Sequence, residues 1–349
     1  MSRPLMSIVI ANWNGKALLK PCLESIFVQN HPTAILPQTR FEIIIVDNGS
    51  TDGSVAFIEK THPELRLIKN PQNLGFAKAN NQGILASKGE FILTLNNDTV
   101  LDKNFLAALM GAAADSEPHV GMWATKILSL SDKTIIDSVG GLLLYPDGLA
   151  RGRGRLERDN SQYDALRKIL LPSACAALYR KKMLDEVGLF DEDFFAYCED
   201  TDLGLRARLL GWDAVNVPGA VCFHSYSATG GDYSTFKAYH VERNRAYVLI
   251  KNFPLSRILS SPFHTLRRYA KQLSSIRSGK GASSRIAKKT GKSGLFFIFI
   301  KVYFAVIINL PTLLKKRRII QRRRTVAESE FSQWLLTDGI SAEELTQKD

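Results

Sequence analysis

The sequence predicts an α/β fold in which a mostly parallel β-sheet is flanked by helices. Apolar runs that are typical of buried strands, such as SIVIAN at residues 7–12 and FEIIIVDN at 41–48, end in Asn or Asp. Stretches with helical patterning separate these runs, so strands and helices alternate along the chain. A β-α-β-α order is expected to give parallel strands with helices on both faces of the sheet.

The first hundred residues are expected to hold further strands and the helices between them. Weaker strand patterns at 66–70 and 90–98 follow the two strands above. STDGS at 50–54 supplies side-chain oxygens and a glycine where the second helix would start. The helices are expected at about residues 16–28, 52–60 and 76–87. Because ligands bind beyond the carboxyl ends of parallel strands, polar residues at these ends should converge on one crevice.

Residues 120–225 no longer show a regular alternation of strand and helix patterns. SVGGLLLYPDGLARGRGR at 138–155 predicts a hairpin with YPDG as its turn, followed by a mobile basic loop. The sequence then predicts a strand at 173–180, a helix at 199–212 with Gly211 near its end, and a strand at 213–224.

Charge divides the chain into three regions. Residues 1–254 carry 27 Lys and Arg against 28 Asp and Glu, residues 255–325 carry 18 basic residues and no acid, and residues 326–349 carry one Lys against six acids. We therefore expect a near-neutral globular domain, a basic and apolar region and an acidic C-terminal tail, with these boundaries. A polyanionic surface is the expected partner of the basic region alone.

An apolar stretch, LFFIFIKVYFAVIINL at 295–310, lies within the basic region. It has 16 residues, fewer than the roughly 20 of a spanning helix, and it contains Lys301. A soluble core helix, an in-plane or re-entrant membrane segment and a nucleic-acid-binding arm each explain part of this pattern. Membrane attachment explains the apolar residues and the cations together, since each basic residue near anionic lipid adds about 1 kcal/mol. We expect residues 255–325 to attach the protein, peripherally or monotopically, to the anionic cytoplasmic face of the inner or plasma membrane, with no nucleic-acid partner.

The cysteines lie far apart and form no Cys-x-x-Cys pair. We expect buried free thiols in a reducing cytosol. The N-terminus shows no secretory signal pattern, because PLMSIVIANWN turns polar too soon. The cysteines are Cys22, Cys175, Cys198 and Cys222.

Predicted strands end in polar residues at Asn12–Asn14, Asp47–Asn48 and Asn96–Asp98. Asp47 can accept hydrogen bonds from a base or ribose, but an Asp in this position also forms turns and caps helices. Asp98 follows another oxygen ligand, Asn96, and so suits Mg²⁺ or Mn²⁺, which prefer oxygen ligands that substrate phosphates often complete. The alternative is that Asp98 or Thr99 caps a helix. A lone histidine such as His224 is more often structural, and becomes a candidate metal ligand only if Asp98 lies nearby.

Three acids, Glu199, Asp200 and Asp202, occupy the start of a predicted helix. Asp202 is expected to pair with Arg206, four residues later. Acids in a first helical turn are also ordinary partners of the helix dipole. Glu199 or Asp200 remains available as a general base at the floor of a cleft.

Seven stretches, in this order, resemble family-two glycosyltransferases of the inverting, GT-A type. They are SIVIANWNG, IIIVDNGSTDGS, NPQNLGFAKANNQGI, FILTLNNDTVLD, GLFDEDFFAYCEDTDLGLRARLLGW, VCFHSYSATGG and ERNRAYVLIKNFP, spread over residues 7–254. The chain is most similar to the rhamnosyltransferase-like enzymes of bacterial surface polysaccharide assembly. The resemblance implies that residues 1–254 form a catalytic domain with a GT-A type, Rossmann-like sheet.

The resemblance also assigns roles by position. Asp200, the second residue of a Glu-Asp motif with Glu199, would be the catalytic base. Asp98 would bind a metal ion, His224 would complete its coordination and Arg243 would reach the diphosphate. Asn96 stands in place of the first acid of the family's Asp-x-Asp motif, and Cys198 precedes Glu-Asp where an aromatic or aliphatic residue is more usual. The donor nucleotide and sugar would be bound by Asn12, Asn14, Asp47, Asn73, Gly75, Asn80, Asn96 and Asn97.

The implied reaction is a single displacement on a nucleoside diphosphate sugar. A divalent metal, Mg²⁺ or Mn²⁺, would stabilise the departing diphosphate, and a carboxylate would take the proton of the acceptor hydroxyl. We expect rhamnose from dTDP-rhamnose to be transferred to a lipid-linked or polysaccharide acceptor. The alternatives are a hexosyltransferase that uses a UDP-sugar, a nucleotidyltransferase that acts on sugar phosphates, and a sugar-binding scaffold without activity.

Overall fold

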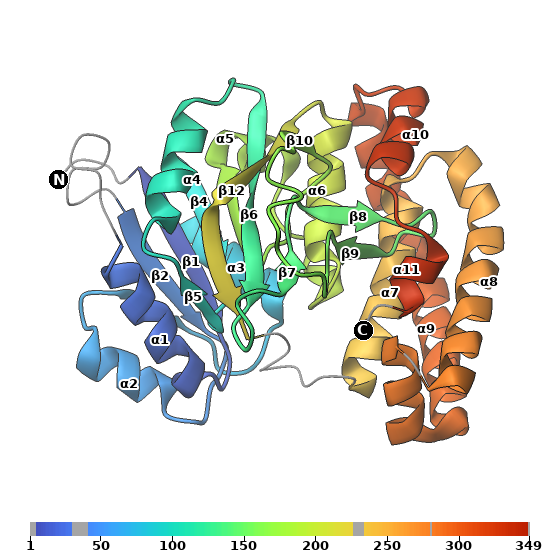
Figure 1. The fold of residues 1–349 in the computed structure, drawn as a ribbon, viewed down its shortest axis with the longest axis horizontal. Helices are drawn as coiled ribbons and strands as arrows, with labels where there is room; N and C mark the ends of the chain where they lie inside the picture. Colours follow the sequence, from blue (N-terminus) through green and yellow to red (C-terminus); the bar gives the residue numbers. More distant parts are fainter. Residues whose placement is uncertain (1–4, 30–40, 226–233, 280, 348–349) are drawn as a thin grey trace.

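The computed structural model describes residues 5–29, 41–225, 234–279 and 281–347 (Figure 1). The end of the VCFHSYSATGG motif, residues 226–231, lies outside them. The centre of the fold is a β-sheet with helices on both faces. One half of this sheet is parallel, in the order β4-β1-β2-β3, and contains the strands expected in the first hundred residues. These are β1 (Met6–Asn12), β2 (Phe41–Asp47), β3 (Arg66–Lys69) and β4 (Phe91–Leu95).

The fourth strand is shorter than its pattern indicates. A strand over 90–98 was predicted, but β4 ends at Leu95 and the three polar residues that follow leave the sheet. The alternative in which Asp98 or Thr99 caps a helix is wrong, because Thr99 opens the short strand β5 (Thr99–Leu101). β5 pairs with β12 (Asp213–His224), and the next helix is α4 (Phe105–Ala114).

The other half of the sheet is mixed. β6 (Val120–Ser129) runs parallel to β12, while β11 (Ala176–Arg180) lies between β4 and β6 and runs opposite to both. The short strands β7 (Ile136–Ser138) and β10 (Lys168–Ile169) pair antiparallel with β6 and β12. Followed across the sheet, β3, β2, β1, β4, β6 and β12 share one direction, so the predicted mostly parallel sheet is confirmed.

Successive side chains of β1 face two helix layers. Ile8 and Ile10 pack with α1 and α4, whereas Val9 packs in a second core with α3, α5 and α6. A strand inside such a sheet has no side facing water, which explains its unbroken apolar run. Each buried side chain of this kind contributes about 1.5–3 kcal/mol. The helices are α1 (Lys16–Phe27), α2 (Ser54–Thr61), α3 (Phe76–Ala86), α5 (Lys181–Val187) and α6 (Glu199–Leu209).

The predicted hairpin is present as β8 (Leu142–Leu144) and β9 (Ala150–Gly152). The loop after it, expected to be mobile, is held by ion pairs. Arg153 lies 2.6 Å from Asp338, and Arg155 is paired with Asp137. Both carboxylates come from other segments of the chain, so the sequence of the loop alone did not indicate this restraint.

Helices form the C-terminal end of the molecule, at the right in Figure 1. α9 is interrupted at Gly291, where φ is 75° and ψ is 165°. The segment predicted as an acidic tail contains two helices that fold back onto the hairpin. Leu144 donates its N–H to the Asp338 carbonyl at 2.8 Å, and Leu345 packs against the same hairpin. The helices are α7 (Thr235–Asn252), α8 (Leu255–Ser278), α9 (Gly281–Arg323), α10 (Glu328–Thr337) and α11 (Ala342–Gln347).

The four cysteines are free thiols, as expected. Cys22 and Cys222 are buried, while Cys175 and Cys198 are partly exposed. Burial raises the pKa of Cys22 to about 12, so this thiol stays protonated near neutral pH.

Candidate active site

The carboxyl ends of β1, β2 and β4 meet, and their polar side chains bond to one another. Asn97 Nδ2 donates to Asn12 Oδ1 at 2.8 Å, and Asn12 Nδ2 donates to Asp47 Oδ1 at 2.9 Å. All three side chains are buried. The N–H of Ser50 donates to the other Asp47 oxygen at 2.9 Å. Asp47 therefore fixes the turn after β2, and its role toward a nucleotide stays a prediction.

The loops after β1 and β2 are tied together beside this row of side chains. The N–H of Asn14 donates to Ser50 Oγ at 2.9 Å, and the N–H of Thr51 donates to Asn14 Oδ1 at 2.7 Å. A Cβ at Gly15 would lie 2.1 Å from Asn97 Nδ2. The glycine therefore lets the chain turn into α1 directly beside the Asn97 amide.

Asn73 and Gly75 lie next to the end of β2. Asn48 Nδ2 donates to Asn73 Oδ1 at 3.0 Å and to the Gly75 carbonyl at 3.1 Å. Gly75 has a φ of 89°, and a Cβ there would lie 2.6 Å from the Phe195 carbonyl oxygen, so this position requires glycine. Asn80 lies further along α3, where its side chain donates to a carbonyl of its own helix at 3.0 Å.

A second cluster surrounds His224. β5 and β12 set Thr99 opposite His224, so the imidazole meets Asp98, with 3.3 Å between His224 Nε2 and Asp98 Oδ1. On the other side of the ring, Nδ1 lies 2.7 Å from Asp137 Oδ2. Asp137 is paired in turn with Arg155. The condition that made His224 a candidate ligand, closeness to Asp98, is therefore met.

Opposite charges stabilise this buried cluster. Burial by itself would lower the pKa of His224, but the Cys175 sulfur and the Asp137 and Asp98 carboxylates hold that pKa well above its usual value. Against the effect of burial, His224 and Arg155 hold the pKa of Asp137 below its usual value. In the protein alone, the ring therefore carries the positive charge that faces Asp98.

The residues present fit a hard divalent cation. Asn96 Oδ1 is buried and has no hydrogen-bond partner among the described residues, and the buried Asp98 Oδ1 faces His224 Nε2 at 3.3 Å. Amide and carboxylate oxygens are ligands that Mg²⁺ and Mn²⁺ accept. The part of the chain that the structure describes holds no group of three or more His, Cys, Asp or Glu side chains suited to a metal. The protein would thus supply Asp98, His224 and Asn96, and substrate oxygens would complete the coordination.

α6 begins with two carboxyl groups, the buried Glu199 and the half-buried Asp200. Asp200 Oδ2 accepts the N–H of Ala174 at 3.2 Å, and Oδ1 accepts the N–H of Thr201 at 2.7 Å. Glu199 Oε2 has no hydrogen-bond partner within the described chain. Burial raises the pKa of Asp200, and burial with the neighbouring Asp200 charge raises the pKa of Glu199 well above its usual value. A carboxyl group with a raised pKa suits general-base chemistry near neutral pH.

A short segment before β11 links the two clusters. The N–H of Ala174 bonds to Asp200, as described above, and the carbonyl of Cys175 accepts the N–H of Asn96 at 2.8 Å. The Cys175 side chain also contacts His224. Asp200 and His224 therefore adjoin two consecutive residues, at the same edge of the sheet.

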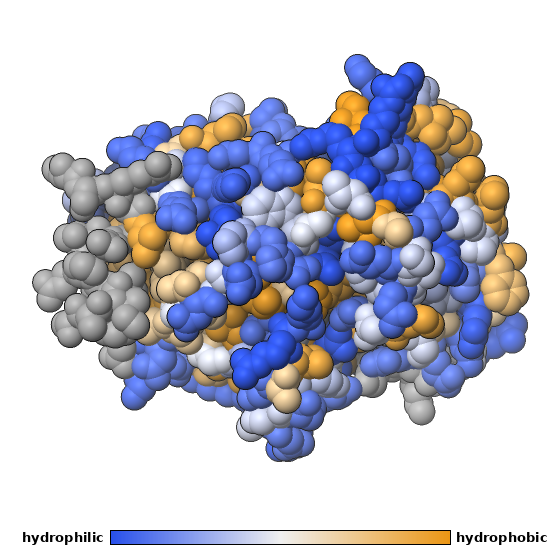
Figure 2. Space-filling view, turned by 90° about the horizontal axis from the view of Figure 1, so that it is seen from above, coloured by the Kyte–Doolittle hydropathy of each residue, from blue (hydrophilic) through white to orange (hydrophobic). Residues whose placement is uncertain are grey.

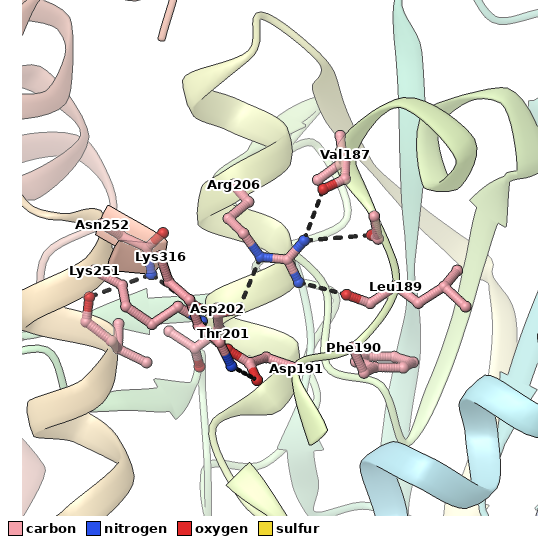
Figure 3. Close-up of polar contacts among 12 residues, drawn as sticks. Val187, Leu189, Phe190, Asp191, Thr201, Asp202, Arg206, Lys251, Asn252 and Lys316 are labelled. Atoms are coloured by element: carbon pink, nitrogen blue, oxygen red, sulfur yellow. Dashed lines mark hydrogen bonds and ion pairs between the residues drawn. The ribbon is translucent and has the colours of Figure 1, made fainter. Parts of the chain in front are cut away.

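Asp202 belongs to a separate, buried ion-pair network (Figure 3). It pairs with Arg206 at 2.8 Å, as the helical spacing predicts, and with Lys251 at 2.7 Å. Lys251 and Lys316 both reach Asp191, at 2.5 and 2.6 Å, which joins α6 to α7 and α9. Burial favours the protonated acid, but Lys251 and Arg206 hold the pKa of Asp202 well below its usual value.

Arg243 lies on α7, beside the short 3₁₀ helix η1 (Glu192–Phe194). Its guanidinium donates to the carbonyl oxygens of Asp193 and Phe194, both at 2.9 Å. These bonds hold η1 against α7. The contact of Arg243 with a diphosphate stays a prediction.

Sequence reasoning did not single out Asp137 and Arg155. Asp137 precedes His224 by 87 residues and lies in a strand of three residues, where one Asp forms no distinctive pattern. The one hint in the sequence was the basic loop that contains Arg155, because its positive charges could be expected to pair with carboxylates elsewhere in the chain.

A comparison with protein families decides the class of this chain. The profile described as glycosyl transferase family 2 matches residues 7–188, more than half of the chain. The chain belongs to glycosyl transferase family 2. The match confirms the resemblance and contains the strand-end residues of β1, β2 and β4. Glu199, Asp200 and His224 lie beyond the matched range.

Curated relatives match the body of this family 2 protein. It is 30% identical over 221 residues to the N-acetylglucosaminyl-diphospho-decaprenol L-rhamnosyltransferase of Mycobacterium tuberculosis, covering 57% of this chain and 71% of that protein. It is 25% identical over 235 residues to the O-antigen biosynthesis protein RfbC of Myxococcus xanthus, covering 65% and 18%. Another relative, the uncharacterized protein y4gI of Sinorhizobium fredii, is 27% identical over 248 residues, covering 66% and 26%. The chain thus spans about a quarter of y4gI and less of RfbC.

Solved structures confirm the GT-A type fold. TarS of S. aureus superposes with a TM-score of 0.51 at 20% identity, covering 94% of this chain and 91% of that one. GalNAc-T7 gives a TM-score of 0.56 at 15% identity, covering 72% and 48%. At these identities the likeness concerns the fold alone.

Proposed function

We propose that this protein is an inverting glycosyltransferase that moves a sugar from a nucleoside diphosphate sugar to a hydroxyl of a lipid-linked or polysaccharide acceptor. Membership of family 2 supports glycosyl transfer. The observation that carries the proposal is the meeting of Asp98 and His224 beside Cys175, with Asp200 bonded to the adjacent Ala174.

Asp200 is the proposed base. An acceptor hydroxyl is barely acidic, and a positioned carboxylate that takes its proton during attack contributes about 10²–10⁴-fold. Two backbone N–H groups orient the Asp200 carboxylate, and burial raises its pKa. Glu199 is the second proposed catalytic carboxyl, and burial together with the Asp200 charge raises its pKa well above its usual value. A single displacement, which inverts the anomeric carbon, needs one such base.

Asp98 and His224, with Asn96, are proposed to hold Mg²⁺ or Mn²⁺. When bound, such an ion offsets the charge that develops on the departing diphosphate. The bond between Asp137 and His224 Nδ1 leaves Nε2 facing Asp98, which suits a shared ligand. GalNAc-T7, which shares the fold, was solved with UDP, GalNAc and Mn²⁺, and this supports a divalent ion.

The proposed donor is dTDP-rhamnose. The name of the mycobacterial relative supports both rhamnose and a lipid-linked acceptor. TarS of S. aureus was solved with UDP-GlcNAc, which favours a UDP-sugar as the second candidate. Arg243 is proposed to reach the diphosphate. The nucleotide and sugar are assigned to Asn12, Asn14, Asp47, Asn73, Gly75, Asn80, Asn96 and Asn97.

We place the protein at the cytoplasmic face of the membrane, where it meets a lipid-linked acceptor. Among the described residues one helix, Gly294–Arg323, is long and apolar enough to cross a membrane, and 11% of its most apolar part is buried in the protein. The 18 basic residues and the absence of acids in 255–325 support contact with anionic lipid.

A panel of nucleotide sugars tests this proposal. Purified protein is incubated with dTDP-rhamnose, UDP-glucose or UDP-GlcNAc, with Mg²⁺ or Mn²⁺, and the released nucleotide is measured. We expect metal-dependent release of dTDP from dTDP-rhamnose, above that from the UDP-sugars. Higher release of UDP would favour the hexosyltransferase alternative, and formation of pyrophosphate from a sugar phosphate and a nucleoside triphosphate would identify a nucleotidyltransferase.

A further inference from the structure

α8 buries three polar side chains and exposes a row of apolar ones. Ser261, Arg268 and Ser275 are buried against the protein. A helix on the surface of a soluble protein normally shows the opposite arrangement. The apolar stripe of α8 recurs every three to seven residues and is 57–74% exposed. It consists of Leu255, Leu259, Phe263, Leu266 and Leu273.

Buried ion pairs fix this orientation of α8. Arg268 lies 2.7 Å from Asp147 in the hairpin turn and 3.0 Å from Glu242 on α7, and all three side chains are buried. Turning the apolar stripe inward would bring this guanidinium into water and leave two carboxylates buried without it, which is unfavourable. The ion pairs of Arg268 therefore hold α8 in the orientation that exposes its apolar stripe.

α9 exposes a second apolar stripe. Val302 and Leu313 on its other side are buried, and the ring of Phe299 contacts Tyr269 of α8 at 5.1 Å between centroids. The two stripes thus belong to adjoining helices. The stripe of α9, 48–66% exposed, consists of Phe296, Ile300, Tyr303, Phe304, Ile307 and Ile308.

The far end of α9 is fastened to the body of the protein. Lys316 lies 2.6 Å from Asp191 (Figure 3) and 2.7 Å from Asp193. Arg317 donates to carbonyls at the end of α7. A spanning helix would leave the body and present apolar side chains all round, whereas one side of α9 stays packed. Its apolar stretch, 295–310, also spans only about 24 Å, against about 30 Å of bilayer hydrocarbon.

We propose that α8 and α9 form an in-plane, monotopic anchor whose two apolar stripes enter one leaflet of an anionic bilayer. The exposed cations Arg267, Lys301, Lys315 and Arg318 lie on the same helices and would meet the lipid headgroups. Hydrophobic and hydrophilic side chains adjoin at this end of the molecule, at the right in Figure 2. The inference deepens the membrane part of the proposed function and is independent of the sugar transferred.

Vesicle flotation of the full chain tests the anchor. The vesicles are phosphatidylcholine alone, or with about one quarter phosphatidylglycerol. The variants Leu259→Glu/Phe263→Glu and Phe304→Glu/Ile307→Glu each place two charges in one stripe. The control, Leu85→Glu, changes a leucine of α3 that is 75% exposed. We expect binding to the anionic vesicles, at least about tenfold weaker binding of both stripe variants, and no change in the control.

Depth of insertion separates the in-plane arrangement from a spanning one. Tryptophan introduced as Phe263→Trp or Phe304→Trp should be quenched by lipids brominated near the headgroup more than by lipids brominated at the chain ends. Stronger quenching from the chain ends would overturn the in-plane anchor.

Absence of vesicle binding would also overturn it. A dimer in solution that both stripe variants dissociate would then identify a second copy of the chain as the occupant. Donor hydrolysis is measured on the same preparations. Protein that hydrolyses the donor but does not bind vesicles would contradict the anchor without contradicting the proposed transfer.

Discussion

At the scale of single residues, the surroundings of His224 suit a metal ligand. Asp137 holds Nδ1 at 2.7 Å, so Nε2 is the nitrogen that faces Asp98. Histidines that bind metals usually donate their other N–H to a carboxylate, which fixes the ring and increases its basicity. Arg155 pairs with the same carboxylate and holds it in place.

Replacing this carboxylate should weaken metal binding. We expect Asp137→Asn to lower the affinity for Mn²⁺ about 10–100-fold, because the amide carries no charge to support the imidazole. Titration of free Mn²⁺ by electron paramagnetic resonance measures the affinity directly. Asp132→Asn, an exposed carboxylate just before β7, should leave it unchanged. Equal affinities for Asp137→Asn and the parent would show that Asp137 does not position the ligand.

The sequence identified one side of this cluster but not the other. Asp98 and His224 stand in motifs at strand ends, where sheet topology predicts that ligand groups converge. Asp137 supports them through a pairing that depends on how β7 docks on β6. No local sequence pattern predicts such a contact, so the role of Asp137 could be recognised only in the folded structure.

At the scale of elements, the charged network around Asp202 holds α6, α7 and α9 together. Lys251 is 1% exposed and contacts both Asp202 and Asp191. Removing one partner of a buried ion pair leaves an uncompensated charge, which typically costs about 3–5 kcal/mol. The helix that carries the proposed base therefore depends on distant lysines for its position.

Lys251→Met should destabilise the fold. We expect the free energy of unfolding to fall by about 3–5 kcal/mol, because Asp202 and Asp191 each lose the buried cation that they share. Urea denaturation measures this change. The matched control Lys316→Met, whose side chain is 31% exposed, should cost clearly less because water screens its pairs. Equal losses in the two variants would contradict a special role for the buried lysine.

The effect of Lys251→Met should also depend on pH. The native pKa of Asp202 is held below its unfolded value of 3.8, so the stabilisation by its pairs is complete above that pH and is lost as pH falls toward the native pKa. Without Lys251, the Asp202 carboxylate of the variant takes up a proton at a higher pH than that of the parent, and this removes the buried charge that destabilises the variant. The stability difference between parent and variant should therefore shrink as pH is lowered below 3.8, and a constant or growing difference would contradict this linkage.

The elements of the first hundred residues followed largely from periodicity, and the end of β4 is an informative exception. β1, β2 and α6 lie close to where apolar runs and helical spacing predicted them. β4 stopped at Leu95, because the strand pattern did not show that the next segment pairs with β12 instead. Local patterns in a single sequence do not show which distant segments pair in the sheet.

At the scale of the whole molecule, the C-terminal segment completes the core of the body. Trp334 on α10 is 5% exposed, lies 5.4 Å from the Phe331 ring, and is covered by the Arg208 guanidinium of α6. Phe331 packs in turn on Phe253. The sequence predicted this segment only as an acidic tail, because a count of charges does not show that its two aromatic residues pack in the core.

Trp334→Ala should therefore behave as a core substitution. We expect a loss of about 3–5 kcal/mol in the free energy of unfolding, from lost apolar burial and the cavity left behind. Leu336→Ala, on the same helix at a residue 78% exposed, should stay within about 0.5 kcal/mol. Thermal and urea unfolding of both variants give the comparison, and a neutral Trp334→Ala would mean that α10 is not part of the folded body.

Proton removal by Asp200, beside the Asp98–His224 pair, is the central step of the proposed sugar transfer. The most direct test is Asp200→Asn, with donor binding by calorimetry and sugar transfer measured on the same preparation. The amide keeps the size of the side chain but cannot take a proton, so we predict near-parental donor affinity and transfer reduced about 10²–10⁴-fold. Near-parental transfer by Asp200→Asn would contradict the account.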